Sequence, residues 1–231
     1  MSQKPNWLTS HGTPWRPGEA RLVYENPWIS VSEHQAVAPT GRPALYGVVR
    51  FKNLAIGVLP IHDDGTIVLV GQHRFAHGAY SWEIPEGGGP LGVDPLDTAK
   101  RELREEAGLT AAVWREAMRF DVSNSITDER GYGYIATGLA AVEAEPDETE
   151  ALTLARVPFR EALDQAGEGG LRDMITLAML WRAYHMAREG ELPRDLAKAS
   201  RTTPLSFVSA IFVSAAVSPS RDAISCTMRI C

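Results

Sequence analysis

The segment covering residues 85–109, PEGGGPLGVDPLDTAKRELREEAGL, constrains the fold most, because a glycine-rich turn leads directly into a helix with clear start and stop signals. Asp94 is suited to the N-cap position and Pro95 to the first helical position. Gly108 can adopt the left-handed backbone conformation that often ends a helix. These signals predict an α-helix over residues 95–107.

Three glutamates of this helix, Glu102, Glu105 and Glu106, are spaced i, i+3 and i+4, so they share one helix face. An apolar stripe lies beside them, made of Leu96, Ala99, Leu103 and Ala107. Carboxylates at the rim of such a stripe are partly desolvated, and clustering them is costly unless a cation lies among them. Hard oxygen ligands of this kind suit Mg²⁺ or Mn²⁺.

The same spacing also fits a solvated helix face, on which the glutamates pair with Lys100, Arg101 and Arg104. For a short motif of this kind taken alone, the solvated face is the more common arrangement. The only cysteines are Cys226 and Cys231, so a metal in this chain would be held by oxygen. The residues around the helix are needed to decide between the two interpretations.

Those residues resemble the Nudix hydrolase box: glycine, five residues, Glu, seven residues, then Arg-Glu-aliphatic-x-Glu-Glu-x-Gly-aliphatic. Eight of the nine fixed positions match, at Gly87, Arg101, Glu102, Leu103, Glu105, Glu106, Gly108 and Leu109. Val93 stands where the family has its first Glu, which mainly braces the loop and the box arginine. Asp94 or Asp97 could take over that contact with Arg101.

The similarity extends over about residues 22–188 and is greatest to the ADP-ribose pyrophosphatase branch of the family. It implies an α/β/α sandwich with a mixed β-sheet. In GQHRF, Arg74 would grip the diphosphate of the substrate. In WEIPEG, the carbonyl of Glu86 would complete a metal's ligand shell, and Glu83 would contact substrate or a metal-bound water. The metal ligands implied by the resemblance are therefore Glu86, Glu102, Glu106 and Glu105.

The resemblance implies Mg²⁺-dependent (or Mn²⁺-dependent) hydrolysis of a nucleoside diphosphate derivative, such as ADP-ribose or a nucleotide sugar, to a nucleoside monophosphate and a sugar phosphate. Glu105 is also a candidate catalytic residue. Relatives take the general base from a loop after the later strands, which here favours Glu150, then Glu148, with Glu129 as a further candidate. Each of these three also fits a solvated acidic loop. The substitution at Val93 keeps open a second interpretation, a Nudix-fold nucleotide-binding or regulatory module without turnover.

Two aromatic residues of the N-terminal region match positions where some relatives stack the adenine ring, partly across a dimer interface. Trp28 and Tyr46 flank the turn VAPTGRP in an expected hairpin over residues 21–52. The resemblance therefore implies a homodimer in which both residues bind the substrate base. Packing in the core or at a surface dimer contact explains the two aromatics equally well.

The remaining sequence favours one globular domain. Residues 1–20 are rich in proline and glycine and are expected to form a loosely ordered arm, residues 21–198 the Nudix domain, and residues 199–231 a serine-rich disordered tail. Two nearly continuous apolar segments, 54–62 and 66–75, predict a central pair of buried strands. The net charge of −6 argues against nucleic-acid and membrane partners. The N-terminus lacks the apolar core of a signal peptide, so we expect a cytoplasmic protein that binds a small nucleotide.

Overall fold

The computed structural model describes residues 5–144 and 151–197 of the chain. The expected tail 199–231 and the candidate bases Glu148 and Glu150 lie outside the described residues. The chain forms two compact units. The first unit contains the residues up to 52 together with 123–129, and the second contains 53–122 and the residues from 130 onward.

The first unit is a three-stranded antiparallel sheet in the order β1-β2-β3. After a short 3₁₀ helix, η1 (Asn6–Leu8), the strands are β1 (Arg16–Glu25), β2 (Ile29–Val37) and β3 (Pro43–Phe51). Residues 16–20, expected in the loose arm, therefore belong to a strand, and the expected hairpin is a three-stranded sheet. Arg16 pairs with Val37 and Pro17 with Ala36, so the ladder with β2 continues through a β-bulge between Pro17 and Ala20. Glycine is needed at this bulge, because a Cβ on Gly18 would lie 2.1 Å from the carbonyl oxygen of Gln35.

The loop at residues 123–129 completes the first unit by binding to β3. Val49 forms two backbone hydrogen bonds with it: its N–H donates to the carbonyl of Ile126 (2.9 Å), and its own carbonyl accepts from the N–H of Asp128 (3.2 Å). The side chain of Asp128 accepts a hydrogen bond from the N–H of Phe51 (2.8 Å) and pairs with Arg50. A segment far along the chain is thus built into the N-terminal sheet.

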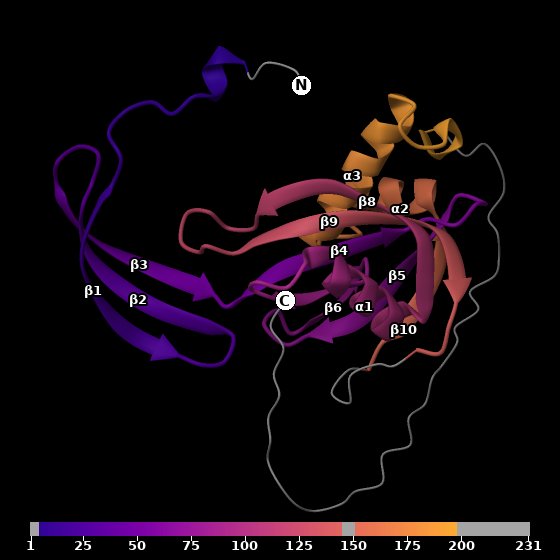
Figure 1. Cartoon of the computed structure of the whole chain (residues 1–231), viewed down its shortest axis with the longest axis horizontal. Coiled ribbons are helices and arrows are strands. Elements are labelled where there is room, and N and C mark those ends of the chain that lie inside the picture. Colours follow the sequence, from indigo (N-terminus) through magenta and orange to yellow (C-terminus); the bar gives the residue numbers. More distant parts are fainter. Residues whose placement is uncertain (1–4, 145–150, 198–231) are drawn as a thin grey trace, which may run out of the picture. The chain divides into compact units, whose positions relative to one another are not determined.

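The second unit contains two sheets, with strand orders β7-β4-β9-β8 and β10-β5-β6 (Figure 1). The strands are β4 (Asn53–Pro60), β5 (Thr66–Arg74), β6 (Ala79–Glu83), β7 (Glu86–Pro90), β8 (Leu109–Asp121), β9 (Arg130–Ala141) and β10 (Thr153–Pro158). Strands β4 and β9 are parallel and the other neighbours antiparallel, so the sheet structure is mixed. The prediction that β4 and β5 form a central pair was wrong. Each is central in its own sheet, and one isolated bridge joins Ile61 to Ile67.

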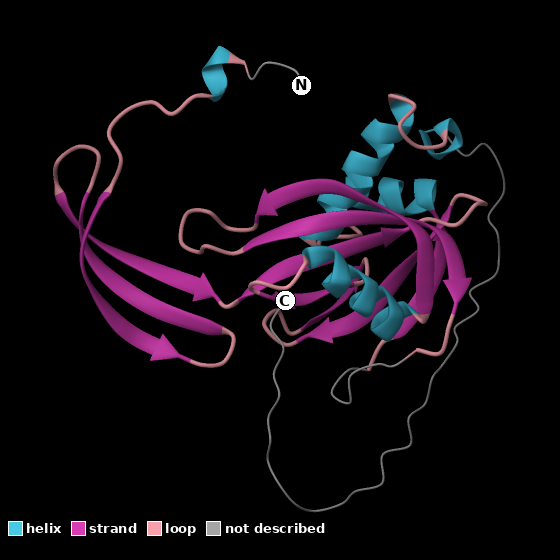
Figure 2. Ribbon diagram, viewed as in Figure 1, coloured by secondary structure: helices cyan, strands magenta, loops and turns pink. Residues whose placement is uncertain are grey.

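Helices cover both faces of these strands, which confirms the α/β/α arrangement (Figure 2). The helices are α1 (Pro95–Ala107), α2 (Phe159–Glu168) and α3 (Met174–Arg188), followed by the 3₁₀ helix η2 (Arg194–Ala197). Side chains alternate along β4: Ile56 and Val58 pack in a cluster with α1, whereas Leu59 packs in a cluster with α2 and α3. No helix among residues 5–144 and 151–197 is long and apolar enough to cross a membrane.

Helix α1 has the bounds that its sequence signals predict, residues 95–107. The side chain of Asp94 caps the helix by accepting a hydrogen bond from the N–H of Leu96 (3.0 Å). Gly108 ends it in the left-handed conformation, with φ of 61°. Because both ends are fixed by local interactions, the direction in which each glutamate of α1 points is fixed as well.

Candidate functional site

The three glutamates of α1 do not share one environment. Glu102 and Glu106 are buried, with 3% and 6% of their surfaces exposed, whereas Glu105 is half-buried and pairs with Arg101. The backbone N–H of Glu86 donates a hydrogen bond to Oε2 of Glu106 (2.9 Å). The carboxylates of Glu102 and Glu106 therefore face the glycine-rich turn, and that of Glu105 lies at the side of the helix.

The carboxylate of Glu102 lies directly against Gly87, the first glycine of the box. A Cβ atom at Gly87 would be 2.2 Å from Oε1 of Glu102 and 2.3 Å from its carboxyl carbon. Real Cβ contacts are never this close, so a side chain at position 87 would displace a buried carboxylate. This contact gives a physical reason for glycine at the start of the motif.

Arg74, at the end of β5, binds two buried carboxylates. Its Nε donates to both oxygens of Glu83 (2.9 and 3.1 Å), and its Nη2 donates to Glu83 and to Oε1 of Glu86 (2.9 Å). The structure thus joins Arg74, Glu83 and Glu86, three residues that the sequence placed in one site. It shows the arginine bound to carboxylates, and its expected contact with a diphosphate stays a prediction.

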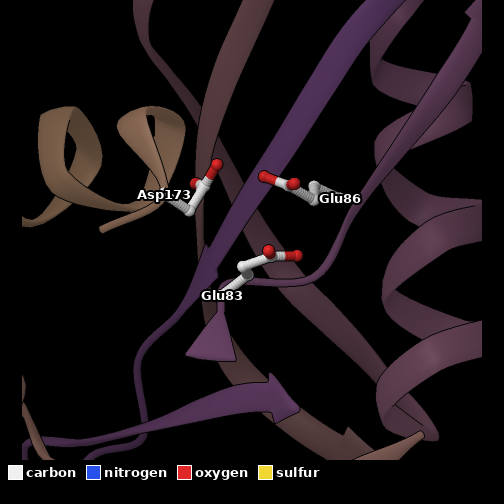
Figure 3. Close-up of side chains that lie close together, drawn as sticks. All are labelled: Glu83, Glu86 and Asp173. Carbon is white, nitrogen blue, oxygen red and sulfur yellow. The ribbon is translucent and has the colours of Figure 1, made fainter. Parts of the chain in front are cut away.

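Asp173, which precedes α3, is a member of this cluster that the sequence analysis missed. One carboxylate oxygen from each of Glu83, Glu86 and Asp173 lies within 4.8 Å of the others. Figure 3 shows the side chains of Glu83 and Glu86, from one short segment, directed toward that of Asp173, which is far along the chain. Burial raises the pKa of Glu86 well above its usual range, and the charges of Asp173 and Glu83 raise it further, whereas Arg74 lowers it.

Arg101 is held without a carboxylate at position 93. It pairs with Glu105 and Glu102, and its Nη2 donates a hydrogen bond to the carbonyl of Gly88 (3.2 Å). The two aspartates that the sequence offered as substitutes for the missing glutamate make other contacts. Asp94 caps α1, and Asp97 pairs with Lys100 (3.3 Å). Contacts from α1 itself and from the glycine-rich turn therefore orient the box arginine.

The two aromatic candidates of the first unit lie apart in the sheet. Tyr46 is paired with His34, whereas Trp28 lies in the turn before β2, where its carbonyl accepts from the N–H of Lys52 (2.8 Å). Trp28 is thus at the end of the hairpin opposite the VAPTGRP turn, contrary to the prediction, because the register of β2 and β3 separates the two positions. Tyr46 packs against Trp15, with ring centroids 5.1 Å apart, and its hydroxyl donates to the carbonyl of Ser125.

Glu129 is the one candidate base that the structure describes. It belongs to the first unit and is half-buried, and burial raises the pKa of its carboxyl above the usual range. The acidic cluster around Glu86 belongs to the second unit. The assignment of the general base therefore stays a prediction for all three glutamates.

The donor set of the cluster fits a hard divalent cation. Counted together with the two buried glutamates of α1, the cluster has four carboxylates that are at most 6% exposed: Glu83, Glu86, Glu102 and Glu106. Arg74 and Arg101 offset part of this charge. Carboxylate oxygens are the ligands that hard divalent cations prefer, and a bound cation would offset negative charge gathered in the cluster.

Two family profiles match the chain, and the boundary between them lies close to the N-terminal boundary between the two units, whereas the loop 123–129 of the first unit falls within the range of the NUDIX profile. The NUDIX domain matches residues 51–178, and the nucleoside diphosphate sugar hydrolase N-terminal domain matches residues 15–49. The second match covers most of the three-stranded sheet of the first unit. The first covers β4 to the start of α3, including every described residue of the acidic cluster.

Curated relatives and a solved structure agree with these matches. The chain is 33% identical to an ADP-ribose pyrophosphatase of Mycobacterium tuberculosis over 146 residues, 62% of this chain and 70% of the relative. It is also 33% identical to a methanol dehydrogenase activator of Bacillus methanolicus over 141 residues, 60% and 76% of the two chains. The crystal structure of an ADP compounds hydrolase has the same fold, with a TM-score of 0.71 at 18% identity, covering 80% of this chain and all of the other. The chain therefore belongs to the Nudix hydrolase family.

Proposed function

We propose that the protein hydrolyses the diphosphate bond of a nucleoside diphosphate derivative, with ADP-ribose or a nucleotide sugar as the substrate class, in a reaction that depends on Mg²⁺ or Mn²⁺. The observation that carries the proposal is the buried cluster of carboxylates around Arg74, because it combines metal ligands with a fixed cation. The relative in M. tuberculosis named ADP-ribose pyrophosphatase supports the choice of substrate class.

The residues of the cluster have different proposed roles, which follow from their positions. Glu102 and Glu106, with the carbonyl of Glu86 and with Glu105 beside them, would hold the cations. Arg74, held by Glu83 and Glu86 at the end of β5, presents a fixed positive charge to the diphosphate. Bound divalent cations supply charge neutralisation at phosphorus and activation of the attacking water. A carboxylate outside α1 would then accept the proton of that water, with Glu150 as the first candidate.

A hydrolysis assay tests the proposal directly. The protein would be incubated with ADP-ribose, nucleotide sugars and nucleoside triphosphates, with Mg²⁺ or with a chelator, and the products separated by chromatography. We expect a nucleoside monophosphate and a sugar phosphate only in the presence of the metal. Absence of product from every substrate, with nucleotide binding retained, would favour the alternative of a binding or regulatory module. Similarity to a protein named as an activator gives that alternative some support.

Replacing Val93 by glutamate is expected to raise the turnover number slightly or to leave it unchanged. Val93 is 45% exposed, so a longer side chain can be accommodated, and Arg101 already has three partners nearby. The measurement is the turnover number of Val93→Glu beside that of Val93→Gln, which has similar volume without the charge. Loss of turnover in the glutamate variant alone would mean that the loop before α1 differs from the family's loop.

We further propose that the protein works as a homodimer built through the first unit. Strand β1 is exposed along its whole length in the single chain, and three consecutive large residues on its two faces are 49–59% exposed: Leu22, Val23 and Tyr24. Apolar surface on both faces of a sheet indicates an interaction site, and a second copy of the chain would cover it symmetrically. Light scattering should give about twice the chain mass of 25.2 kDa. A mass of one chain at micromolar concentration would refute the dimer.

Within the proposed dimer, we expect Trp28 to stack on the base of the substrate. A stacked aromatic contributes about 1–3 kcal/mol per base, so Trp28→Ala should raise the Michaelis constant for ADP-ribose about ten- to a hundredfold. The turnover number should change less, because the base is remote from the reacting phosphorus. Trp7→Ala is the matched control, since Trp7 is another tryptophan of the first unit and is 76% exposed. An unchanged Michaelis constant would assign Trp28 to packing.

A further inference from the structure

The backbone of residues 83–86 carries two carboxylates of the cluster, and beyond the pairing of Glu83 with Val70 in the β5–β6 ladder it forms three hydrogen bonds to other elements. Two of the bonds come from α1 and β4: Glu86 N–H to Oε2 of Glu106 (2.9 Å), and Val58 N–H to the carbonyl of Pro85 (2.8 Å). The third comes from α3, where the hydroxyl oxygen of Thr176 accepts a hydrogen bond from the N–H of Ile84 (2.9 Å). None of the roles assigned above uses this third bond.

Both partners of the third bond are completely buried. Ile84 and Thr176 each have 0% of their surface exposed, so water cannot replace the hydroxyl as the acceptor of the Ile84 N–H. The N–H of Ile84 and the carbonyl of Glu83 belong to one planar peptide unit. Fixing that N–H therefore fixes the direction in which the chain leaves Glu83.

The position of Thr176 is itself determined by the start of α3. Asp173 caps the helix, with its Oδ2 accepting from the N–H of Thr176 (2.7 Å). Asp173 therefore has two positions in the structure: its carboxylate lies beside Glu83 and Glu86, and it also caps the first turn of α3. In consequence, the hydroxyl of Thr176 meets Ile84 at the point where the cluster is assembled.

Two glycines let α3 approach the sheet closely enough for this bond. Gly57 on β4 and Gly133 on β9 are register partners in the parallel pair. A Cβ at Gly57 would lie 2.6 Å from Cγ2 of Ile175, and a Cβ at Gly133 would lie 2.2 Å from Sδ of Met179. Because Ile175 and Met179 are one turn apart, the first two turns of α3 lie directly on a depression that the missing side chains leave.

We infer that Thr176 is a positioning residue for the hydrolytic site: through Ile84 it holds the segment whose carboxylates, Glu83 and Glu86, orient Arg74 and whose carbonyl at Glu86 is assigned to the cations. The inference rests on the proposed function. Groups that orient metal ligands without touching the metal influence affinity and rate strongly, because ligands must be held in a narrow geometry. Thr176 differs from an ordinary core threonine in that its effect passes to the site through one hydrogen bond.

The test compares Thr176→Val, which keeps the shape but removes the acceptor, with Thr176→Ser, which keeps the acceptor. Binding of Mn²⁺ to the full chain would be followed by electron paramagnetic resonance, with turnover of ADP-ribose and the melting temperature measured in parallel. We expect Thr176→Val to weaken Mn²⁺ binding and lower turnover about 10- to 100-fold. Thr176→Ser should bind Mn²⁺ as the unaltered protein does.

A control separates positioning from stability. Met186 is also completely buried on α3, three turns from Thr176 and outside the cluster, so Met186→Ala should lower the melting temperature without weakening Mn²⁺ binding. Unchanged Mn²⁺ binding in Thr176→Val, or equal weakening in Met186→Ala, would overturn the inference. A separate variant, Glu106→Gln, tests the proposed metal site itself. If it bound Mn²⁺ as tightly as the unaltered protein, the proposed metal site would be wrong, and the inference about Thr176 would be wrong with it.

Discussion

A Glu106→Gln variant is expected to lose about 10²–10³-fold in turnover number, the scale seen when one preorganised group that stabilises transition-state charge is removed. The substitution removes one negative ligand from the cluster while keeping its volume, and the amide oxygen can still accept the hydrogen bond from Glu86 N–H. Glu102→Gln should behave similarly. The measurement is the turnover number for ADP-ribose at saturating Mg²⁺, with Mn²⁺ binding as a second readout.

The control for this prediction is Glu168→Gln, which makes the same chemical change on an exposed residue at the end of α2. That variant should keep full turnover. The melting temperature of Glu106→Gln in chelator should equal or exceed that of the unaltered protein, because a neutral amide relieves repulsion among buried carboxylates. Near-normal turnover in Glu106→Gln would mean that the box glutamates do not form the metal site of this protein.

Gly87→Ala is expected to reduce turnover about 10²-fold, because a displacement of about 1 Å in a catalytic arrangement costs on that order. The added Cβ would overlap the carboxylate of Glu102, which is buried between the glycine-rich turn and α1 and has little room to move. Both Mn²⁺ affinity and turnover should fall together. A substrate-binding defect alone, with a raised Michaelis constant and unchanged turnover, would contradict this explanation.

The matched control is Gly167→Ala on α2, since a Cβ at Gly167 would meet nothing within 4 Å and the glycine lies within a helix. Alanine is favoured over glycine inside helices, so this variant should be as stable as the unaltered protein or slightly more so. Equal loss of activity in both glycine variants would point to a general effect on folding. Loss in Gly87→Ala alone would locate the effect at Glu102.

Parts of the fold and site that depend on local interactions could be predicted from the sequence. Helix α1 has the predicted bounds because Asp94 and Gly108 fix its ends within a few residues. The box spacing likewise selected Glu102 and Glu106, and the structure places Glu106 beside the backbone of Glu86 and Glu102 against Gly87. In these cases the determining contacts are either within one helix or between that helix and the turn before it.

The remainder depends on tertiary pairing that no local pattern encodes. The apolar character of β4 and β5 indicated burial of both strands, but it could not show that each strand is central in a different sheet. Asp173 could be recognised as a helix cap, whereas its place beside Glu83 follows from the fold of segments that are far apart in the chain. The bond from Ile84 to Thr176 spans 92 residues. The register that separates Trp28 from Tyr46 is equally a property of the assembled sheet.

The loop at residues 123–129 has a consequence for exchanging parts between relatives. The N-terminal profile match ends at residue 49, which suggests that the first sheet could be cut from one protein and grafted onto another as a cassette. That cut would leave behind the segment whose Ile126 and Asp128 bind Val49 and Phe51. A chimera would therefore need two exchanged segments, one at the start of the chain and one between β8 and β9, and inheritance of this sheet between homologues would require the two to change in concert.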